Sequence, residues 1–174
     1  LITVSGLSIT SVAGGNSSAP EDYVLDSTTK TVNATITPKT VSLAVAPKVY
    51  DASTDMTGYV SITTGVGGET LTYNGATSND AHVATAGKYL NAITLGNASD
   101  GSGGLASNYQ LPTLNVTNAP ITINPKTVSL AVAPKVYDAS TDMTGYVSIT
   151  TGVGGETLTY NGATSNDAHV ATAV

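Results

Sequence analysis

The chain has 174 residues and a formal net charge of −6, from six Lys, no Arg and twelve Asp plus Glu. An acidic surface without arginine repels phosphate groups, so the composition argues against a nucleic acid as partner. The sequence contains no Cys, which excludes disulfide bonds and thiolate metal sites among these residues.

Short stretches of alternating apolar residues predict β-strands from one end of the chain to the other. The opening LITVSGLSIT lacks the basic start of a signal peptide and predicts a strand. The dipeptide Asn74-Gly75 predicts a type I′ hairpin turn. No stretch has helical spacing, and no apolar run approaches the roughly 18 residues of a membrane span. The later strands are expected in VSLAVA (41–46), KVYDA (48–52), YVSIT (59–63), HVATA (82–86), KYLNAITL (88–95), NYQLPTLNVT (108–117) and APITIN (119–124).

Strand density predicts the fold class. About seven short strands in 87 residues, with a turn signal every 8–12 residues, indicate an all-β protein built from small antiparallel β-sandwich (Ig-like) domains. A β-grasp-like unit is the alternative. The repeating length of 87 residues gives each unit only a modest core, made of Val, Ile, Leu, Ala and Tyr, because the sequence contains no Phe or Trp.

A long internal repeat dominates the sequence. Residues 38–86, here called the first copy, and residues 125–173, the second copy, are identical at all 49 positions, so the period is 87 residues. Because the same local pattern is present twice, we expect the same backbone in both copies. Differences should concentrate near Gly87 and Val174, where the sequences that follow the two copies diverge.

Proline residues mark the expected boundaries. TITPKT (35–40) and TINPKT (122–127) occupy equivalent places, and each Pro fixes φ and biases the preceding residue towards extended geometry. A short joint stiffened by Pro predicts units arranged end to end as a rod, each adding roughly 35–40 Å. The predicted parts are the C-terminal part of a repeat (1–37), a complete repeat (38–124) and the N-terminal part of the next repeat (125–174).

Three short motifs carry a resemblance to a known family. They are KVYDAST (48–54), NYQL (108–111) and ITINPK (121–126), with the characteristic residues Lys48, Tyr50, Asp51, Asn108, Tyr109, Leu111, Ile123, Pro125 and Lys126. Their order resembles YDG/MBG-type tandem repeats of large bacterial surface adhesins and filamentous-haemagglutinin-like exoproteins. The resemblance implies an extracellular polymer of β-domains, at the bacterial cell surface or in a secreted matrix, without catalytic residues. The family usually has Gly after Tyr-Asp, whereas this chain has Ala52 and Ala139, which argues against a positive-φ turn there.

Acidic residues in the turns are the candidate metal ligands, because carboxylate oxygens are the groups that Ca²⁺ prefers. No EF-hand or glycine-rich nonapeptide pattern accompanies them, so solvated turns are the plainer interpretation. No other cofactor is expected. The calcium candidates are Asp51, Asp55, Asp80, Asp100, Asp138, Asp142 and Asp167.

Other residue patterns are poor signals for chemistry. Ser78, Asp80 and His82 would share one face of a strand, but alternate residues stand about 6–7 Å apart and cannot converge as a hydrolytic triad, so no enzyme activity is expected. The tyrosines are expected to fill the core or rim, with a sugar-stacking platform as the alternative; they are Tyr50, Tyr59, Tyr73, Tyr89 and Tyr109. Glycosylation sequons occur at Asn16, Asn33, Asn97 and Asn115.

Two functions from different classes remain open. One is a structural repeat that gives length to an extracellular stalk, adhesin or filament, which fits nearly identical neighbouring units because a spacer works through copy number. The other is an adhesive module that binds glycans or a host surface, with or without calcium, for which verbatim duplication makes sense only through avidity. We favour the structural repeat.

The two outer parts are expected to complement each other. Residues 125–174 have the front strands of a repeat, and residues 1–37 have the back strands. Alone, each would expose an apolar face and unpaired edges. We therefore expect residues 125–174 to be completed by residues 1–37 of a neighbouring copy, along one polypeptide or by strand exchange between chains. Such a head-to-tail contact does not close and can propagate.

Overall fold

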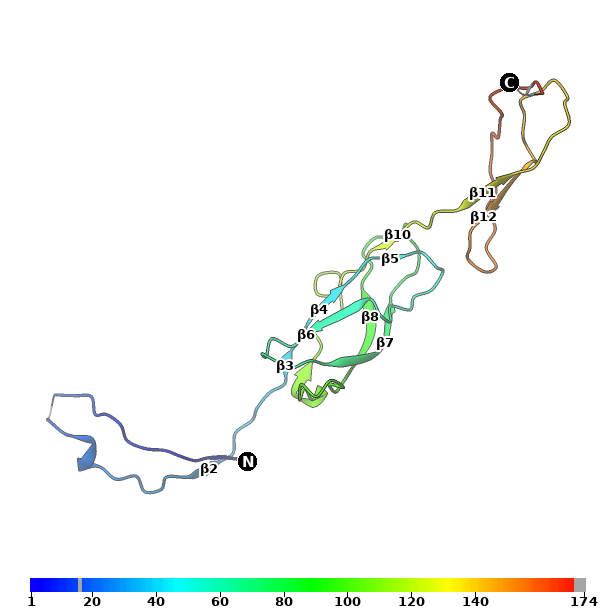
Figure 1. The fold of residues 1–174 in the computed structure, drawn as a ribbon. Helices are drawn as coiled ribbons and strands as arrows, with labels where there is room; N and C mark the ends of the chain where they lie inside the picture. Colours follow the sequence, from blue (N-terminus) through cyan, green and yellow to red (C-terminus); the bar gives the residue numbers. More distant parts are fainter. Residues whose placement is uncertain (16, 171–174) are drawn as a thin grey trace. The chain divides into compact units, whose positions relative to one another are not determined.

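The computed structural model describes residues 1–15 and 17–170. In this part of the chain the regular structure is β-strand, apart from two single-turn 3-10 helices, which confirms the all-β class. The chain divides into two units, Leu1–Lys39 and a larger one that begins at Thr40. Each is considered by itself (Figure 1).

The elements of the described residues follow in chain order. The 3-10 helices are η1 (Pro20–Asp22) and η2 (Ala106–Asn108). The strands are β1 (Ile2–Val4), β2 (Lys30–Val32), β3 (Lys39–Thr40), β4 (Ser42–Val45), β5 (Lys48–Val49), β6 (Val60–Thr63), β7 (Thr72–Ser78), β8 (Leu90–Gly96), β9 (Tyr109–Gln110), β10 (Ile123–Asn124), β11 (Ser129–Val132) and β12 (Val147–Thr150).

The first unit is a long two-stranded hairpin. Strands β1 and β2 pair antiparallel, with Ile2 opposite Val32 and Val4 opposite Lys30. The predicted opening strand is therefore real but is confined to Ile2–Val4. Helix η1 interrupts the connection and is followed by Tyr23 in extended geometry.

Each copy of the repeat contains the same hairpin. In the first copy β4 pairs antiparallel with β6, so that Val45 lies opposite Val60. In the second copy β11 pairs with β12 in the same register, with Val132 opposite Val147. The β-branched and alternating residues of VSLAVA and YVSIT suit such a pleated pair. The prediction of strands in these two stretches is confirmed.

Strand β7 crosses the dipeptide that was expected to turn. Asn74 and Gly75 both lie inside β7, which pairs antiparallel with β8. The predicted hairpin turn is therefore wrong. Gly75 has φ 63°, and the register with β8 shifts between Asn74 and Thr77, as at a β-bulge. The positive φ of Gly75 is therefore part of a β-bulge here and not of a hairpin turn.

The remaining strand pairs join the first copy to residues 87–124, here called the completing segment. Strand β3 pairs with β9, and β5 pairs with β10. The β5–β10 pair is parallel, with Lys48 opposite Ile123, so the antiparallel prediction is wrong at this pair. The predicted strand HVATA (82–86) has no regular structure, and NYQLPTLNVT contributes only β9.

The core of the complete repeat is made jointly by the first copy and the completing segment. The first copy supplies Met56, Val60 and Ala76. The completing segment supplies Leu90, Ile93, Ala119, Ile121 and Ile123. Met56, Ala76, Leu90 and Ala119 are fully buried. Since most buried core residues come from the completing segment, the first copy alone cannot close this core.

The two identical copies do not have identical strands. The counterparts of β3, β5 and β7 in the second copy, residues 126–127, 135–136 and 159–165, are not strands, apart from a single bridge between Asp142 and Thr164. The expectation of one backbone for both copies is therefore wrong at these three strands. The reason is pairing: the partners of β3, β5 and β7 are β9, β10 and β8, and all three lie in the completing segment.

Candidate functional site

The apolar face of the second copy is the most unusual surface of the described chain. Leu130 and Val132 of β11 are 67% and 63% exposed, whereas their counterparts Leu43 and Val45 pack against the core of the complete repeat. Met143, the counterpart of the fully buried Met56, is only half-buried. Identical side chains thus have less cover in the second copy than in the complete repeat.

This face is hollowed into a groove of about 500 Å³. In the first copy, the corresponding residues of β4, β6 and β7 pack on the completing segment. The groove therefore lies at the place where, in the complete repeat, the completing segment packs. Its lining is Leu130, Val132, Met143, Val147, Ile149, Tyr160, Gly162, Ala163, Thr164 and Ser165.

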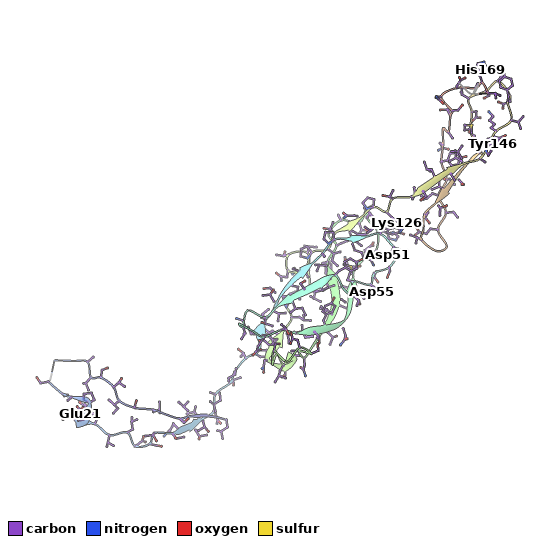
Figure 2. The ribbon with its side chains drawn as sticks, in the orientation of Figure 1. Glu21, Asp51, Asp55, Lys126, Tyr146 and His169 are labelled. Atoms are coloured by element: carbon purple, nitrogen blue, oxygen red, sulfur yellow. The ribbon has the colours of Figure 1, made fainter. Side chains whose placement is uncertain are left out.

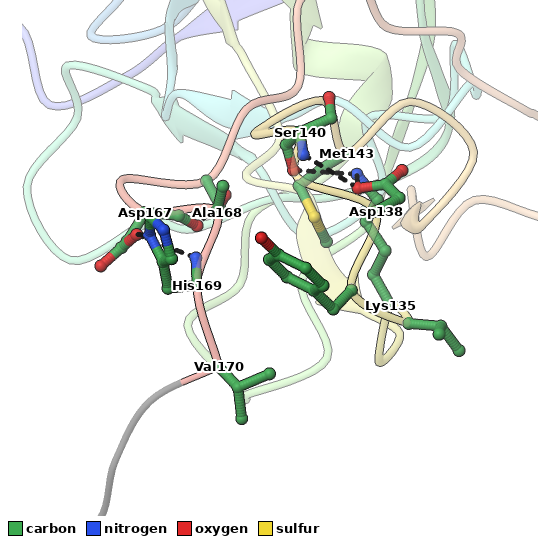
Figure 3. Close-up of a pocket in the computed structure, with 11 residues that line it drawn as sticks. Lys135, Asp138, Ser140, Met143, Asp167, Ala168, His169 and Val170 are labelled. Carbon is green, nitrogen blue, oxygen red and sulfur yellow. Dashed lines mark hydrogen bonds and ion pairs between the residues drawn. The ribbon is translucent and has the colours of Figure 1, made fainter.

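A second, more polar hollow adjoins the groove. Figure 3 shows it between the loop that carries Lys135 and Asp138 and the segment that carries Asp167 and His169, with Met143 between them. Its volume is about 260 Å³. Because Met143 lines both hollows, they form one continuous acceptor face, which is the name used below for the residues that line them.

A lysine organises the loop beside this face in both copies. The Lys48 ammonium donates to the carbonyl oxygens of Ser53 (2.9 Å) and Asp55 (2.7 Å) and forms an ion pair with Asp51 (2.8 Å). Lys48 is only 3% exposed, and this full set of partners allows its charge to be buried. The motif KVYDAST contains this lysine, but no pattern in the sequence indicates its role in the loop.

The second copy repeats the lysine-centred loop without the completing segment. Lys135 donates to the carbonyl oxygens of Ser140 (3.0 Å) and Asp142 (2.6 Å) and pairs with Asp138 at 2.8 Å. The loop is therefore encoded locally by KVYDASTD. What the completing segment adds is burial and the parallel strand β10.

Ala52 and Ala139 adopt the positive φ that their identity was expected to disfavour. Their φ angles are 62° and 59°. The prediction against a positive-φ turn is therefore wrong at both positions. Left-handed geometry costs an alanine roughly 1–2 kcal/mol relative to its usual regions. The lysine, bonded to carbonyls on the far side of each turn, holds the loop in this shape.

The calcium candidates each serve their own local turn. The carboxylate of Asp51 accepts from the Ser53 N–H, and those of Asp55, Asp80, Asp138, Asp142 and Asp167 likewise accept from a backbone N–H two residues on. Within residues 1–15 and 17–170, no three acidic, His or Cys side chains gather in a way that could hold a metal ion. Figure 2 labels Asp51 and Asp55, both in the loop between β5 and β6. Calcium binding stays a prediction.

Asp100 also bonds to a side chain that is distant in sequence. It accepts from the Thr70 hydroxyl at 2.7 Å and from the Ser102 N–H at 3.0 Å. The Thr70 hydroxyl, together with the backbone and hydroxyl of Ser102, lowers the pKa of Asp100 to about 2. The hydrogen bonds among these three residues connect the turn after β8 to the loop before β7.

The lysine loop also shifts the pKa of its aspartate. Desolvation raises the pKa of Asp51, but the hydrogen bond from Lys48 and the Ser53 N–H outweigh it, so the net pKa lies below its usual value. In the second copy, Lys135 is the main cause that lowers the pKa of Asp138. Both aspartates are therefore held in the charged form.

The Ser-Asp-His pattern does not assemble into a hydrolytic triad. The Ser78 hydroxyl donates to the carbonyl oxygen of Asp80 at 2.8 Å, and the Asp80 carboxylate accepts from the backbone N–H of His82. The His82 ring instead stacks on Tyr50, with ring centroids 6.1 Å apart.

The tyrosines act mostly within the fold. Tyr73 accepts from the backbone N–H of Gly58 at 2.8 Å, and Tyr109 donates to Glu69, which raises the pKa of Tyr109. Tyr50 donates to Glu156 of the second copy, and this bond is the main reason that the pKa of Tyr50 is raised. Tyr59 and Tyr89 are half-buried.

The glycosylation candidates lie in different settings. Asn33 and Asn97 are exposed, and Asn115 is half-buried. The side-chain oxygen of Asn97 accepts from the Ala106 N–H at 2.9 Å. The side-chain oxygen of Asn115 accepts from two backbone N–H groups of the following turn. Asn16 lies outside the described residues.

The first unit shares a local feature with the completing segment, a 3-10 helix followed by a tyrosine in extended geometry. In the completing segment, Tyr89 bridges Pro120 antiparallel, and η2 precedes Tyr109. In the first unit β1 pairs with β2, and η1 precedes Tyr23. Both tyrosines have φ −130° and donate their N–H to the first residue of the 3-10 helix. Tyr23 is 54% exposed, however, whereas Tyr109 is buried.

Compared with protein-family models, curated proteins and solved structures, the chain shows no match to any of them. In addition, none of the helices among the described residues is long and apolar enough to cross a membrane. We therefore base the functional proposal on the repeat, its two halves and the acceptor face.

Proposed function

We propose that these residues belong to a structural repeat of an extracellular stalk, adhesin or surface filament of a bacterium, whose contribution is length and head-to-tail assembly. In this proposal each complete 87-residue repeat is a small sandwich-like β-domain. The order of the motifs KVYDAST, NYQL and ITINPK, which resembles YDG/MBG-type repeats, supports the extracellular setting. The parts 1–37, 38–124 and 125–174 are then consecutive pieces of one repeating series.

The observation that carries the proposal is the division of the repeat into two halves that need each other. The first copy and the completing segment share one core, and in the identical second copy the counterparts of its buried residues are only half-buried. Because the strand pairing and the core lie inside each complete repeat, such a module can stand at every position of a series. Copying such a module verbatim adds reach without requiring a specialised site.

Arrays of known copy number test the proposal. One, two and three copies of the 174-residue chain are fused head to tail, and the maximum dimension is measured by small-angle scattering. A rod whose length rises by a constant increment per copy is expected, at about 70–80 Å per fused chain from the strand rise and two repeats. A compact globule at every copy number would contradict the structural role.

The adhesive alternative is read out on the same arrays. Calcium titration and a glycan array are applied to the one-copy and three-copy proteins. The structural role predicts no saturable binding in either protein. Saturable binding that strengthens with copy number would instead favour an adhesive module that acts through avidity.

A further inference from the structure

The acceptor face has a known occupant in the complete repeat. There, the completing segment lays β10 in parallel beside β5, and it places Leu90, Ile93 and Ile121 in the core with Met56. The Lys48 N–H donates to the Thr122 carbonyl at 3.0 Å, and the Tyr50 N–H donates to the Asn124 carbonyl at 2.9 Å. The first copy thus shows, for an identical sequence, which kind of segment fills the face.

The N-terminal segment, residues 1–37, is a segment of the same kind. Like the completing segment, it has a 3-10 helix followed by an extended tyrosine, and it ends in TIT before PKT where the completing segment ends in TIN. Its apolar side chains are uncovered in the first unit: Ile36 is 84% exposed, Val24 is 92% and Leu1 is 88%. An exposed donor and an exposed acceptor therefore occur in one chain.

We propose that, in the 174-residue chain, the acceptor face of one molecule binds residues 1–37 of a second molecule by β-strand addition. This inference rests on the proposed function and names the partner that fills the face. By the pattern of the complete repeat, Ile36 and Thr37 add in parallel beside Lys135 and Val136. Each molecule then gives one segment and receives another, so the contact propagates.

The same pattern assigns one polar contact across the interface. In the complete repeat the Tyr109 hydroxyl donates to the Glu69 carboxylate. The counterparts are Tyr23 of the donor and Glu156 of the acceptor. Glu156 accepts from Tyr50 in the single chain. On completion, Tyr23 takes the place that Tyr109 has in the complete repeat.

Because the chain has no Cys, engineered disulfides give a clean test. The paired variant is Thr37→Cys with Val136→Cys. Its positions correspond to Asn124 and Val49, which lie opposite each other in the parallel β5–β10 pair. Strand neighbours lie about 4.8 Å apart, within the reach of a disulfide. All four positions are exposed, so the substitutions leave the core intact.

Two further variants serve as controls. Val49→Cys with Asn124→Cys places the same bond inside the complete repeat, so it closes within one chain at any concentration. Thr37→Cys with Thr150→Cys moves the second thiol to the C-terminal end of β12, where Thr150 lies opposite Ser129 and not beside Thr37 in the proposed pairing. All variants are equilibrated in a glutathione redox buffer over a range of chain concentrations and analysed on non-reducing gels.

The paired variant is expected to give a concentration-dependent ladder of dimers, trimers and longer species, well above the mismatched variant. A ladder no stronger than that of the mismatched variant would overturn the proposal. So would a monomer with an internal disulfide, because residues 1–37 would then close on their own chain. Either result could occur while fused arrays still lengthen linearly, so failure here is distinguishable from failure of the proposed function.

Discussion

The two copies of the repeat are a natural experiment on what a local sequence can encode. Both form the same hairpin in the same register, β4–β6 and β11–β12, and both wrap a loop around a lysine. Only the first copy, which packs on the completing segment, has the strands β3, β5 and β7 and a buried core. Hairpins and loops are thus encoded locally, while strand partners and burial come from elsewhere in the chain.

The largest difference between the copies should appear at the core methionine. Met56→Ala is expected to lower the free energy of unfolding of the complete repeat by about 2–5 kcal/mol, because it empties a fully buried site. Met143→Ala removes a half-buried side chain and should cost the dilute chain less than about 1 kcal/mol. Urea unfolding followed by NMR signals of both copies measures the pair. Equal losses at the two positions would contradict the account.

A smaller difference is expected at the lysine. Lys48→Met keeps the apolar stem but leaves two carbonyls and the Asp51 carboxylate without their donor. We expect a loss of about 2 kcal/mol, below the usual range for a broken buried pair because Asp51 is half-exposed. Lys135→Met should cost less, and the exposed Lys39→Met should be close to neutral. The same urea experiment applies, and a neutral Lys48→Met would remove the lysine from its role in the loop.

The alanines with positive φ should respond in the opposite direction. Ala52→Gly is expected to stabilise the complete repeat by about 0.5–1 kcal/mol, because glycine tolerates φ 62° without the penalty of a Cβ. Ala44→Gly in β4 is the matched control and should destabilise by a similar amount, since glycine weakens a strand. Thermal unfolding of the two variants gives the sign. A loss at both positions would show that Ala52 is not strained.

The smallest expected effect concerns pH. The folded pKa of Asp100, about 2, lies below the ordinary value of 3.8, so folding favours its charged form. This contribution is present above about pH 4 and is lost as the pH falls through 2. An NMR titration of the Asp100 carboxyl should show a midpoint near pH 2, and Thr70→Val should move it upward. A midpoint unchanged by Thr70→Val would remove the hydroxyl as the main cause.

Sequence reasoning succeeded where short-range pattern decides the structure. Alternation in VSLAVA and YVSIT predicted the hairpin strands, and the absence of helical spacing predicted the all-β class. It failed where a strand partner distant in sequence or a β-bulge determines the structure. Asn74-Gly75 has turn chemistry, but strand β8 lies beside it and holds it in a bulged strand. The parallel β5–β10 pair joins residues 75 positions apart in sequence, which no local pattern encodes.

The acceptor face was only partly visible in the sequence. Residues 125–173 repeat only the sequence of the first copy, and from this an open apolar face could be predicted. The role of Lys135 could not be predicted, because its partners are the backbone carbonyls of Ser140 and Asp142, and every residue has a backbone carbonyl. The positive φ of Ala139 was hidden for the same reason, since the loop geometry overrides the residue's preference.

Amide hydrogen exchange measured by NMR, at low and high concentration of the 174-residue chain, tests the central claim most directly. The amides of Met56 and Met143 donate within their own copies at 2.8 Å and serve as matched controls. We expect the Lys48 and Tyr50 amides to be protected in dilute solution and those of Lys135 and Tyr137 to exchange rapidly. The Lys135 and Tyr137 amides should gain protection as the chain concentration rises. Equal protection of both pairs in dilute solution, or no gain on concentration, would contradict the claim.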